Sequence, residues 1–313
     1  MLSRAGFNRW CPRATPLLLV ASNLPDIDIL FALGGSLDYL DQHRGYTHSL
    51  TAAPLLGAAA ATLVRLFDRK ALPWMRAAIL ATAGILCHLL LDWTNTYGIR
   101  MLLPFSGEWL RLDITNVVDV WIWTVLALCV AGPLLSRLVS SEIGAKPGTG
   151  RGAAIFALAF LIGYNCGRYV AHERAVNLLL SHSYSGAAPR RVGAFPHFAN
   201  PWAWTTVVET PSAVILQKIN LLLTYDPTGG ESFFYPPPSR TLEAARSTRT
   251  FQRYLNFAQF PLWQVVPLDR PEGGARVDVI DLRFGDPGHP RFVATAVVNA
   301  AFRVDEEGFS FGK

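Results

Sequence analysis

Histidine and aspartate residues at spacings suited to metal binding occur in three short segments of the chain. In the first, residues 23–28, Asp26 and Asp28 follow Pro25 and stand two positions apart. Two carboxylates at this spacing converge on one ion if the backbone turns. A solvated loop, or a helix start that favours Asp, accounts for the pair equally well. Both interpretations stay open at this point.

The second segment, residues 43–49, contains two histidines immediately before an apolar run. His43 and His48 are five positions apart, with Gly45 between them, which suits a turn that leads into a helix. Imidazole is a common ligand for zinc and similar metals, and its second nitrogen needs an outer hydrogen-bond acceptor. Arg44 has a planar fork of donors suited to an anionic substrate group such as a phosphate. The alternative is a polar loop at the membrane interface.

The third segment, residues 88–98, places a histidine and an aspartate near the end of an apolar run. His88 and Asp92 are four residues apart, so they share one helix face and can bind one ion together. Such residues are costly in an apolar span unless they are paired, coordinated or hydrated. Asn95 can add hydrogen bonds, and Gly98 is expected to end the helix. The alternative is a structural His–Asp pair between helices.

The three segments together predict a divalent-metal site. Its expected ligands are Asp26, Asp28, His43, His48, His88 and Asp92. Mixed imidazole and carboxylate ligation suits zinc first, with manganese or iron as alternatives, in a hydrolytic site where the metal lowers the pKa of water. Asp26 and Asp92 are the expected catalytic carboxylates, one of them as general base. Arg44 and Asn95 are the expected substrate-binding residues.

The composition indicates that a membrane positions these segments. The 313 residues are 51% hydrophobic and 16% charged, whereas a soluble domain carries about a quarter charged residues. The deficit lies within residues 14–171. Apolar stretches near the length that crosses about 30 Å of hydrocarbon, and one shorter run at 15–24, predict four to five apolar helices. The longer stretches are 50–67, 74–93, 117–138 and 153–170.

The basic residues predict the orientation of these helices. Two loops separated by an even number of crossings are rich in Lys and Arg, which the positive-inside rule assigns to the cytoplasm. The His and Asp segments and the C-terminal region then face outward. The net charge is +5, but no basic stripe is interleaved with aromatics, so we expect the lipid bilayer and not nucleic acid as the partner. The basic loop residues are Arg65, Arg69, Lys70 and Arg76, and Arg137, Lys146 and Arg151.

The C-terminal region has the pattern of a small, mainly β domain. Short runs rich in β-branched and aromatic residues alternate with Pro- and Gly-rich turns such as 235–238 and 271–274. The runs are 204–208, 213–223, 264–267, 277–284 and 292–298. The predicted organisation is therefore a helical integral membrane domain, residues 1–171, followed by an extracytoplasmic domain, residues 172–313, without a recognisable catalytic motif.

The motif segments resemble the YdjM-like family of inner-membrane metal-dependent hydrolases. The matching residues are 24–28, 43–49, 88–98, 104–106 and 119–121, within a resemblance that runs from residue 5 to residue 135. The resemblance implies a helical domain in the cell inner membrane and divalent-metal binding. Family members usually begin with a further apolar helix that carries a Thr-His pair, whereas this sequence starts after that point. We therefore expect that its start codon has been assigned too late; the alternative is that the protein lacks this first helix and one metal ligand.

These observations favour a multi-pass, membrane-bound, metal-dependent hydrolase. Its expected substrate is a phosphoester or a lipid-linked compound at the outer face of the bilayer, and the phosphoester part depends on Arg44 and on the membrane setting. The alternative is a non-catalytic metal-binding membrane scaffold or a regulatory, partner-binding protein.

Overall fold

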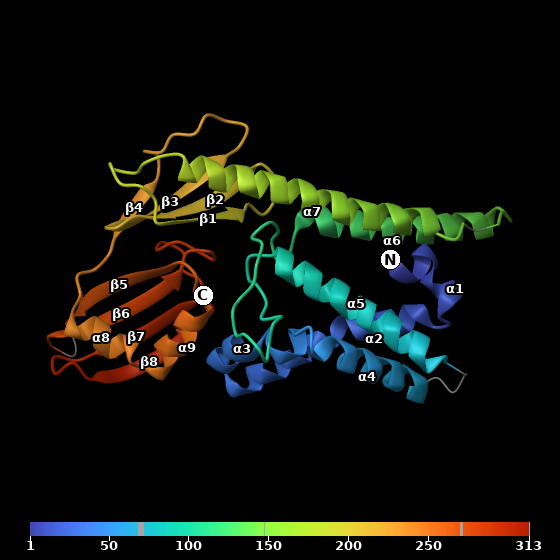
Figure 1. Cartoon of the computed structure of the whole chain (residues 1–313), viewed down its shortest axis with the longest axis horizontal. Helices are drawn as coiled ribbons and strands as arrows, with labels where there is room; N and C mark the ends of the chain where they lie inside the picture. Colours follow the sequence, from blue (N-terminus) through green and yellow to red (C-terminus); the bar gives the residue numbers. More distant parts are fainter. Residues whose placement is uncertain (68–71, 147, 270–271, 313) are drawn as a thin grey trace. The chain divides into compact units, whose positions relative to one another are not determined.

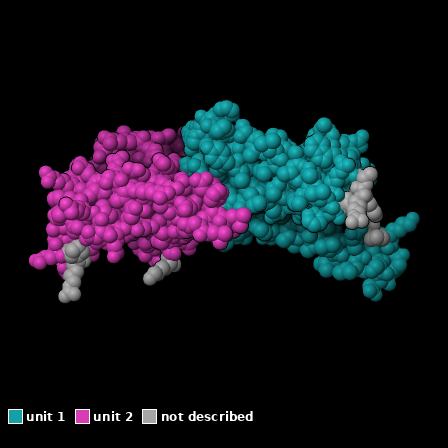
Figure 2. Space-filling model, turned by 90° about the horizontal axis from the view of Figure 1, so that it is seen from below, with its two compact units in different colours: residues 1–28, 44–172, 196–201 teal, residues 29–43, 173–195, 202–313 magenta. Residues whose placement is uncertain are grey.

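The computed structural model describes residues 1–67, 72–146, 148–269 and 272–312. The chain forms two compact units, which are coloured separately in Figure 2. The first unit comprises Met1–Asp28, Arg44–His172 and Pro196–Pro201, and the second comprises Ile29–His43, Glu173–Phe195 and Trp202–Lys313. The arrangement within each unit determines where the candidate ligands lie.

Helices dominate the first unit (Figure 1). Two short helical segments, η1 and α1, precede α2, and the 3-10 helix η2 follows α2 directly. Both η2 and α7 continue into residues of the second unit. The bounds are η1 Ser3–Phe7, α1 Asn8–Trp10, α2 Ala14–Asn23, η2 Pro25–Gly34, η3 Tyr46–His48, α4 Ala52–Phe67, α5 Trp74–Thr94, α6 Val120–Glu142 and α7 Arg151–Leu180.

Four helical stretches among the described residues are long and apolar enough to cross a membrane: Ala14–Gly34, Trp74–Thr94, Val120–Glu142 and Arg151–Leu180. A fifth is added if Ser36–His48 and Ala52–Phe67, bent by 81°, form one broken span. The prediction of four to five apolar helices is confirmed. The run expected at 15–24 is longer than predicted because η2 extends it beyond Pro25. In contrast, the described part of α4 has 16 residues, fewer than a straight crossing needs.

Small residues allow α4 and α5 to pack closely in the first unit. The buried face of α4 consists of Ala53, Gly57, Ala60, Ala61 and Val64. A Cβ atom on Gly57 would lie 2.1 Å from Thr82 Oγ1 and 2.9 Å from the Thr82 backbone nitrogen. Packing between helices in a membrane depends on such small side chains because lipid supplies no hydrophobic driving force. This close approach brings the segment before α4 beside the C-terminal half of α5.

Two antiparallel four-stranded sheets dominate the second unit, with strand orders β1-β2-β3-β4 and β5-β6-β7-β8 (Figure 1). The strands are β1 Arg191–Pro196, β2 Ala203–Glu209, β3 Ala213–Asn220, β4 Glu231–Phe234, β5 Pro261–Leu268, β6 Gly274–Asp281, β7 Val293–Val298 and β8 Val304–Ser310. Three helices complete the unit: α3 Ser36–Gln42, α8 Arg240–Arg246 and α9 Arg249–Phe257. The mainly β character of this region is confirmed.

A fully buried ion pair stabilises the second sheet. Arg283 Nη2 lies 2.7 Å from Asp281 Oδ2, and both side chains are completely inaccessible to solvent. The backbone nitrogens of Gln259 and Arg283 also donate to the two oxygens of Asp281. Burial by itself would raise the pKa of Asp281, but the Arg283 guanidinium and these hydrogen bonds hold that pKa below its usual value. All of the charge of this carboxylate is balanced by the chain itself.

Candidate metal centre

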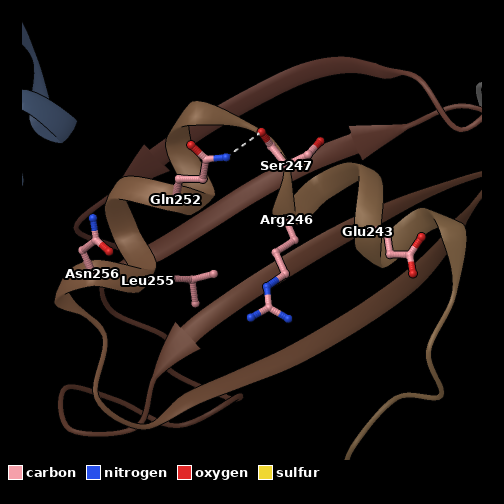
Figure 3. Close-up of a pocket in the computed structure, with 6 residues that line it drawn as sticks. All are labelled: Glu243, Arg246, Ser247, Gln252, Leu255 and Asn256. Carbon is pink, nitrogen blue, oxygen red and sulfur yellow. Dashed lines mark hydrogen bonds between the residues drawn. The ribbon is translucent and has the colours of Figure 1, made fainter.

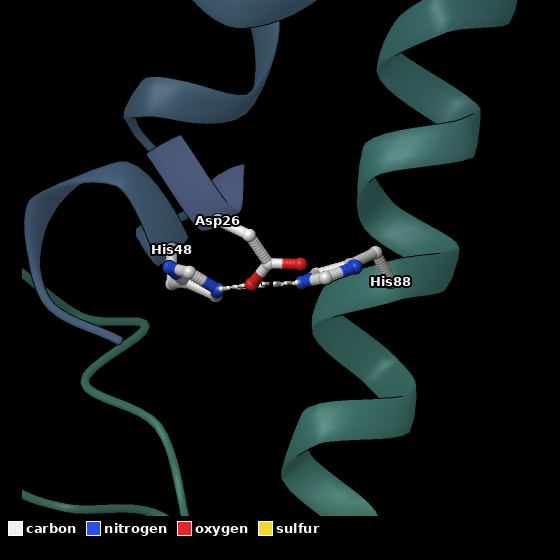
Figure 4. A group of neighbouring side chains, drawn as sticks. All are labelled: Asp26, His48 and His88. Carbon is white, nitrogen blue, oxygen red and sulfur yellow. Dashed lines mark hydrogen bonds and ion pairs between the residues drawn. The ribbon is translucent and has the colours of Figure 1, made fainter. Parts of the chain in front are cut away.

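Three separate elements of the first unit bring Asp26, His48 and His88 together (Figure 4). Asp26 comes from the start of η2, His48 from η3 and His88 from α5. Asp26 Oδ1 is 3.3 Å from His48 Nε2 and 3.6 Å from His88 Nε2. The two Nε2 atoms are 3.3 Å apart. These residues form a group that could hold a metal ion.

Asp92 adds a second carboxylate to the same histidine pair. Its Oδ2 lies 3.2 Å from His88 Nε2 and 3.5 Å from His48 Nε2. This oxygen is buried, and no donor among the described residues makes a hydrogen bond to it. A buried carboxylate oxygen without a donor is costly. A positive charge between Asp92 Oδ2 and the two imidazole nitrogens would therefore stabilise this oxygen.

The spacings fit neighbouring ligands on a single ion. Zinc binds imidazole nitrogen and carboxylate oxygen at about 2.0–2.2 Å, so two ligands at the tetrahedral angle lie about 3.3–3.6 Å apart. The five separations above run from 3.2 to 3.6 Å. Asp26, His48 and His88 make one triangle of this size, and Asp92 makes a second on the same histidine pair. The residues present therefore fit a divalent metal.

A single proton is the other positive charge that could neutralise this group. Two imidazole nitrogens and two carboxylate oxygens face one another here. A proton on one imidazole satisfies one such contact at a time, whereas a metal ion satisfies all of its ligands together. The geometry favours the ion.

Asp28 contacts His48 through the other ring nitrogen. Asp28 Oδ2 is 3.1 Å from His48 Nδ1 and accepts hydrogen bonds from Thr47 Oγ1 and from the Arg44 backbone nitrogen. A carboxylate at Nδ1 favours the tautomer whose Nε2 lone pair can bind metal. Asp28 is buried, and these contacts favour an outer-shell role for it over the ligand role that the sequence predicts.

The guanidinium of Arg44 binds other residues of the helical unit. Its Nη2 is 2.9 Å from Asp92 Oδ1, and its Nη1 donates to Asn95 Oδ1 at 2.9 Å and to the Gly98 carbonyl at 3.3 Å. Only 8% of the side chain is exposed. Its backbone has a φ of 56°, a conformation that a non-glycine residue keeps only when its surroundings enforce it. These contacts favour positioning of Asp92 over the predicted contact with substrate.

Asn95 shapes the end of α5. The helix ends at Thr94, four residues before the predicted stop at Gly98. The Asn95 side-chain oxygen accepts hydrogen bonds from the backbone nitrogens of Tyr97 and Gly98, which replaces helical bonding with a turn. Gly98 lies in this turn with a φ of 85°, where glycine is favoured. Asn95 therefore supports Arg44, and its predicted contact with substrate stays a prediction.

His43 does not belong to the group of potential ligands found among the described residues. It lies in the second unit and stacks on Tyr39, with ring centroids 4.6 Å apart. Thr47, in contrast, received no role from sequence reasoning, although its hydroxyl donates to Asp28 and lies 3.1 Å from His48 Nδ1. The sequence signal for this role of Thr47 is its position directly before His48.

The second unit carries a large open cavity of its own, of about 650 Å³ (Figure 3). It lies at α8, α9 and the turn between them, and its lining residues are Glu243, Arg246, Ser247, Gln252, Leu255 and Asn256. With a single carboxylate and no His or Cys among them, these residues do not make a metal site. The candidate chemistry therefore belongs to the helical unit.

Apolar helices that can cross a bilayer, together with a converging set of His and Asp side chains, define an integral membrane protein with a candidate metal centre. The chain matches the family of the YdjM inner membrane protein over residues 2–175 and belongs to that family. It is thus a multi-pass protein of the inner membrane. It is also similar to the uncharacterized protein YfhP of Bacillus subtilis (strain 168), with 24% identity over 284 residues, 88% of this chain and 79% of that protein. No solved structure matches it.

Proposed function

We propose that the protein is a membrane-embedded, metal-dependent hydrolase that cleaves a phosphoester or a lipid-linked substrate at the outer face of the bilayer. The observation that carries this proposal is the set of ligand-like spacings among Asp26, His48, His88 and Asp92. A divalent ion, zinc first and manganese or iron as alternatives, would lower the pKa of water there and stabilise the charge that develops on the cleaved group.

The four side chains differ in exposure, which suggests different roles. His48 is fully buried and His88 is 17% exposed, so both suit fixed ligands. Asp92 is held by Arg44 and suits a third fixed ligand. The Asp26 side chain is 48% exposed, so water and substrate can reach it. Asp26 is therefore placed to accept a proton from the attacking water as general base.

The same exposure favours an enzyme over a metal-binding scaffold. Structural metal sites are closed by protein ligands, whereas catalytic sites keep one position open. The group here is closed on the side of His48 and open on the side of Asp26. A scaffold has no need of an exposed carboxylate at its ion.

The outward orientation rests on the positive-inside rule. Arg65 at the end of α4, Arg76 at the start of α5, and Arg137 and Arg151 on α6 and α7 support one cytoplasmic side; Arg69 and Lys70 lie outside the described residues. An alkaline phosphatase fused after residue 313 is expected to be active, and one fused at residue 145 inactive. The reverse pattern would place the centre on the cytoplasmic side.

Turnover by metal-reconstituted protein tests the proposed chemistry. Protein depleted of metal and reloaded with zinc, manganese or iron would be assayed on p-nitrophenyl phosphate, a phosphodiester analogue and a fluorescent phospholipid. Loss of a general base lowers turnover by about 10²–10⁴-fold. The Asp26→Asn variant should therefore turn substrate over more slowly by this factor. The control is His289→Ala, since His289 is 94% exposed and remote in sequence from the motifs. Metal-loaded wild type without turnover on any substrate would favour the scaffold.

A further inference from the structure

The segment of residues 29–43 joins two parts of the candidate metal centre. Asp28 directly precedes this segment and Arg44 directly follows it. The Arg44 backbone nitrogen donates to Asp28 Oδ2 at 2.9 Å, so the segment is a loop whose two ends are tied together beside His48. The segment itself, however, belongs to the second unit, and its contacts there determine its conformation.

The helix of this segment, α3, is held by the C-terminal part of the chain. With seven residues, α3 is too short to be stable by itself. It packs on α9 and β8 within the second unit (Figure 1), where the Ser36 hydroxyl donates to the Phe309 carbonyl at 2.8 Å. Arg253 of α9 pairs with two carboxylates of α3, with its Nη1 2.5 Å from Asp38 Oδ1 and its Nη2 3.3 Å from Asp41 Oδ2. The position of α3 therefore depends on α9 and β8.

Aromatic rings extend these contacts to the residue before Arg44. The ring of Tyr39 in α3 meets that of Phe311 edge to face, with centroids 5.8 Å apart, and stacks on His43 at 4.6 Å. The next residue along the chain is Arg44, whose guanidinium pairs with Asp92. These contacts give His43 a role other than metal ligation, because they fix the chain directly before Arg44.

The backbone of Arg44 makes the centre sensitive to α3. Its φ of 56° persists only where the surroundings enforce it. Asp28 holds the Arg44 nitrogen on one side, and His43, stacked on α3, fixes the chain on the other. A displacement of α3 would therefore move Arg44, and with it the partner of Asp92.

We propose that the second unit positions the metal centre through α3, and that Arg253 is the positioning residue. Its two ion pairs hold α3 in place, and the ordered segment keeps Asp28 and Arg44, at its two ends, in contact with the metal ligands. This inference rests on the metal ion of the proposed function but not on the proposed cleavage.

Replacing Arg253 in full-length protein tests this inference. Arg253→Ala removes both ion pairs, and Arg253→Lys keeps the positive charge as the conservative variant. Arg276→Ala is the matched control, because Arg276 forms a partly exposed pair with Asp278 at 2.8 Å in strand β6 of the same unit. A partly exposed ion pair adds little to global stability, so all variants should stay folded.

Three measurements follow the effect from α3 to the centre. Hydrogen exchange in metal-free protein would report the order of α3 and of residues 44–49. Zinc affinity would be measured by competition with a chelator, and the visible spectrum of cobalt-loaded protein would report the geometry of the ligands.

Mutations that act through a coupled element change affinity by about 2- to 30-fold, so Arg253→Ala should weaken zinc binding by a factor in this range. Hydrogen exchange of α3 and of residues 44–49 should become faster, and the cobalt spectrum should change. Arg253→Lys should recover most of the wild-type values, and Arg276→Ala should match wild type in all three measurements.

Faster exchange of α3 in Arg253→Ala, at wild-type zinc affinity and with an unchanged cobalt spectrum, would overturn the positioning role. Unchanged exchange of α3 would also overturn it, because Arg253 would then not hold the helix. If the metal measurements respond as expected but wild type cleaves no substrate, the positioning stands and the proposed hydrolase fails. If wild type and Arg253→Ala bind metal and cleave substrate equally, the hydrolase stands and the positioning fails. Wild-type protein that binds no metal would contradict both.

Discussion

The two units of the molecule each bury a charged group, and they neutralise it differently. In the second unit, Asp281 forms an ion pair with Arg283, and its two oxygens accept hydrogen bonds from backbone nitrogens. Both side chains of the pair are fully buried. In the helical unit, Asp92 receives Arg44 on one oxygen only. Its other oxygen faces the Nε2 atoms of His48 and His88.

This difference separates a group with a structural role from a group that is a candidate for binding an external ion. A buried charge must be paired or coordinated, because its desolvation is otherwise too costly. The Asp281–Arg283 pair meets this condition with residues of the chain. The group around His48, in which Arg44 reaches one oxygen of Asp92, would meet it with a bound cation. Four predictions sharpen this contrast, and the largest concerns the enclosed pair.

Asp281→Ala should leave Arg283 as an uncompensated buried charge. Breaking a buried pair in this way costs about 3–5 kcal/mol. Hydrogen exchange of strands β5 and β6 should therefore become much faster, while exchange of α5 and the metal content stay unchanged. The double variant Asp281→Leu/Arg283→Met removes both charges and should recover most of the protection. A single variant as stable as wild type would show that the pair is not the structural element proposed here.

Asp28→Ala should weaken metal binding without removing a ligand. Loss of an outer-shell carboxylate from a ligating histidine costs about 10–100-fold in metal affinity. Zinc affinity would be measured by competition with a chelator. Asp28→Asn should lose less because its amide oxygen can still accept from His48 Nδ1 and Thr47. Asp286→Ala, at an exposed turn, is the control. Complete loss of metal in Asp28→Asn would instead make Asp28 a direct ligand.

Acid should destabilise the second unit through Asp281, with a smaller effect than its removal. The pKa of Asp281 in the folded protein is below its usual value of 3.8. Its contribution to stability is therefore fully present above about pH 4 and is lost as the pH falls through the folded pKa. Hydrogen exchange of β5 at falling pH would measure this. Asp281→Asn should have a flatter pH dependence below pH 4; an unchanged dependence would assign the acid sensitivity to other groups.

Local spacing in the sequence was enough to predict part of the candidate site. The i and i+4 pair His88 and Asp92 lies on one helix, so its geometry follows from helix periodicity. The convergence of Asp26 and His48 on that pair depends on the packing of α2, α4 and α5, which spacing does not encode. For the same reason the outer-shell contacts of Asp28 and Arg44 emerged only from the structure.

The fold likewise has elements that the local sequence predicts and elements that it does not. The length of the apolar stretches predicts the spans, because the thickness of the bilayer sets that length. Runs rich in β-branched and aromatic residues, separated by Pro- and Gly-rich turns, predict strands β2, β3, β5, β6 and β7. Strand β8 was missed because its sequence, Val-Asp-Glu-Glu-Gly-Phe-Ser, is mostly polar and exposed. Helix α9 was missed although its buried residues Thr250, Phe251, Tyr254 and Phe257 have helical spacing. The segment is polar on average, so its sequence signals are this spacing and Thr248 as the N-cap residue.

The measurement that tests the central claim most directly is elemental analysis of full-length protein purified in detergent. Wild type would be compared with His48→Ala/His88→Ala and with His289→Ala, after identical exposure to zinc, manganese and iron. The account predicts near-stoichiometric metal in wild type and in His289→Ala, and almost none in the double variant. Well-folded wild type without metal, or a double variant that retains it, would contradict the assignment of these histidines and their carboxylates to a metal centre.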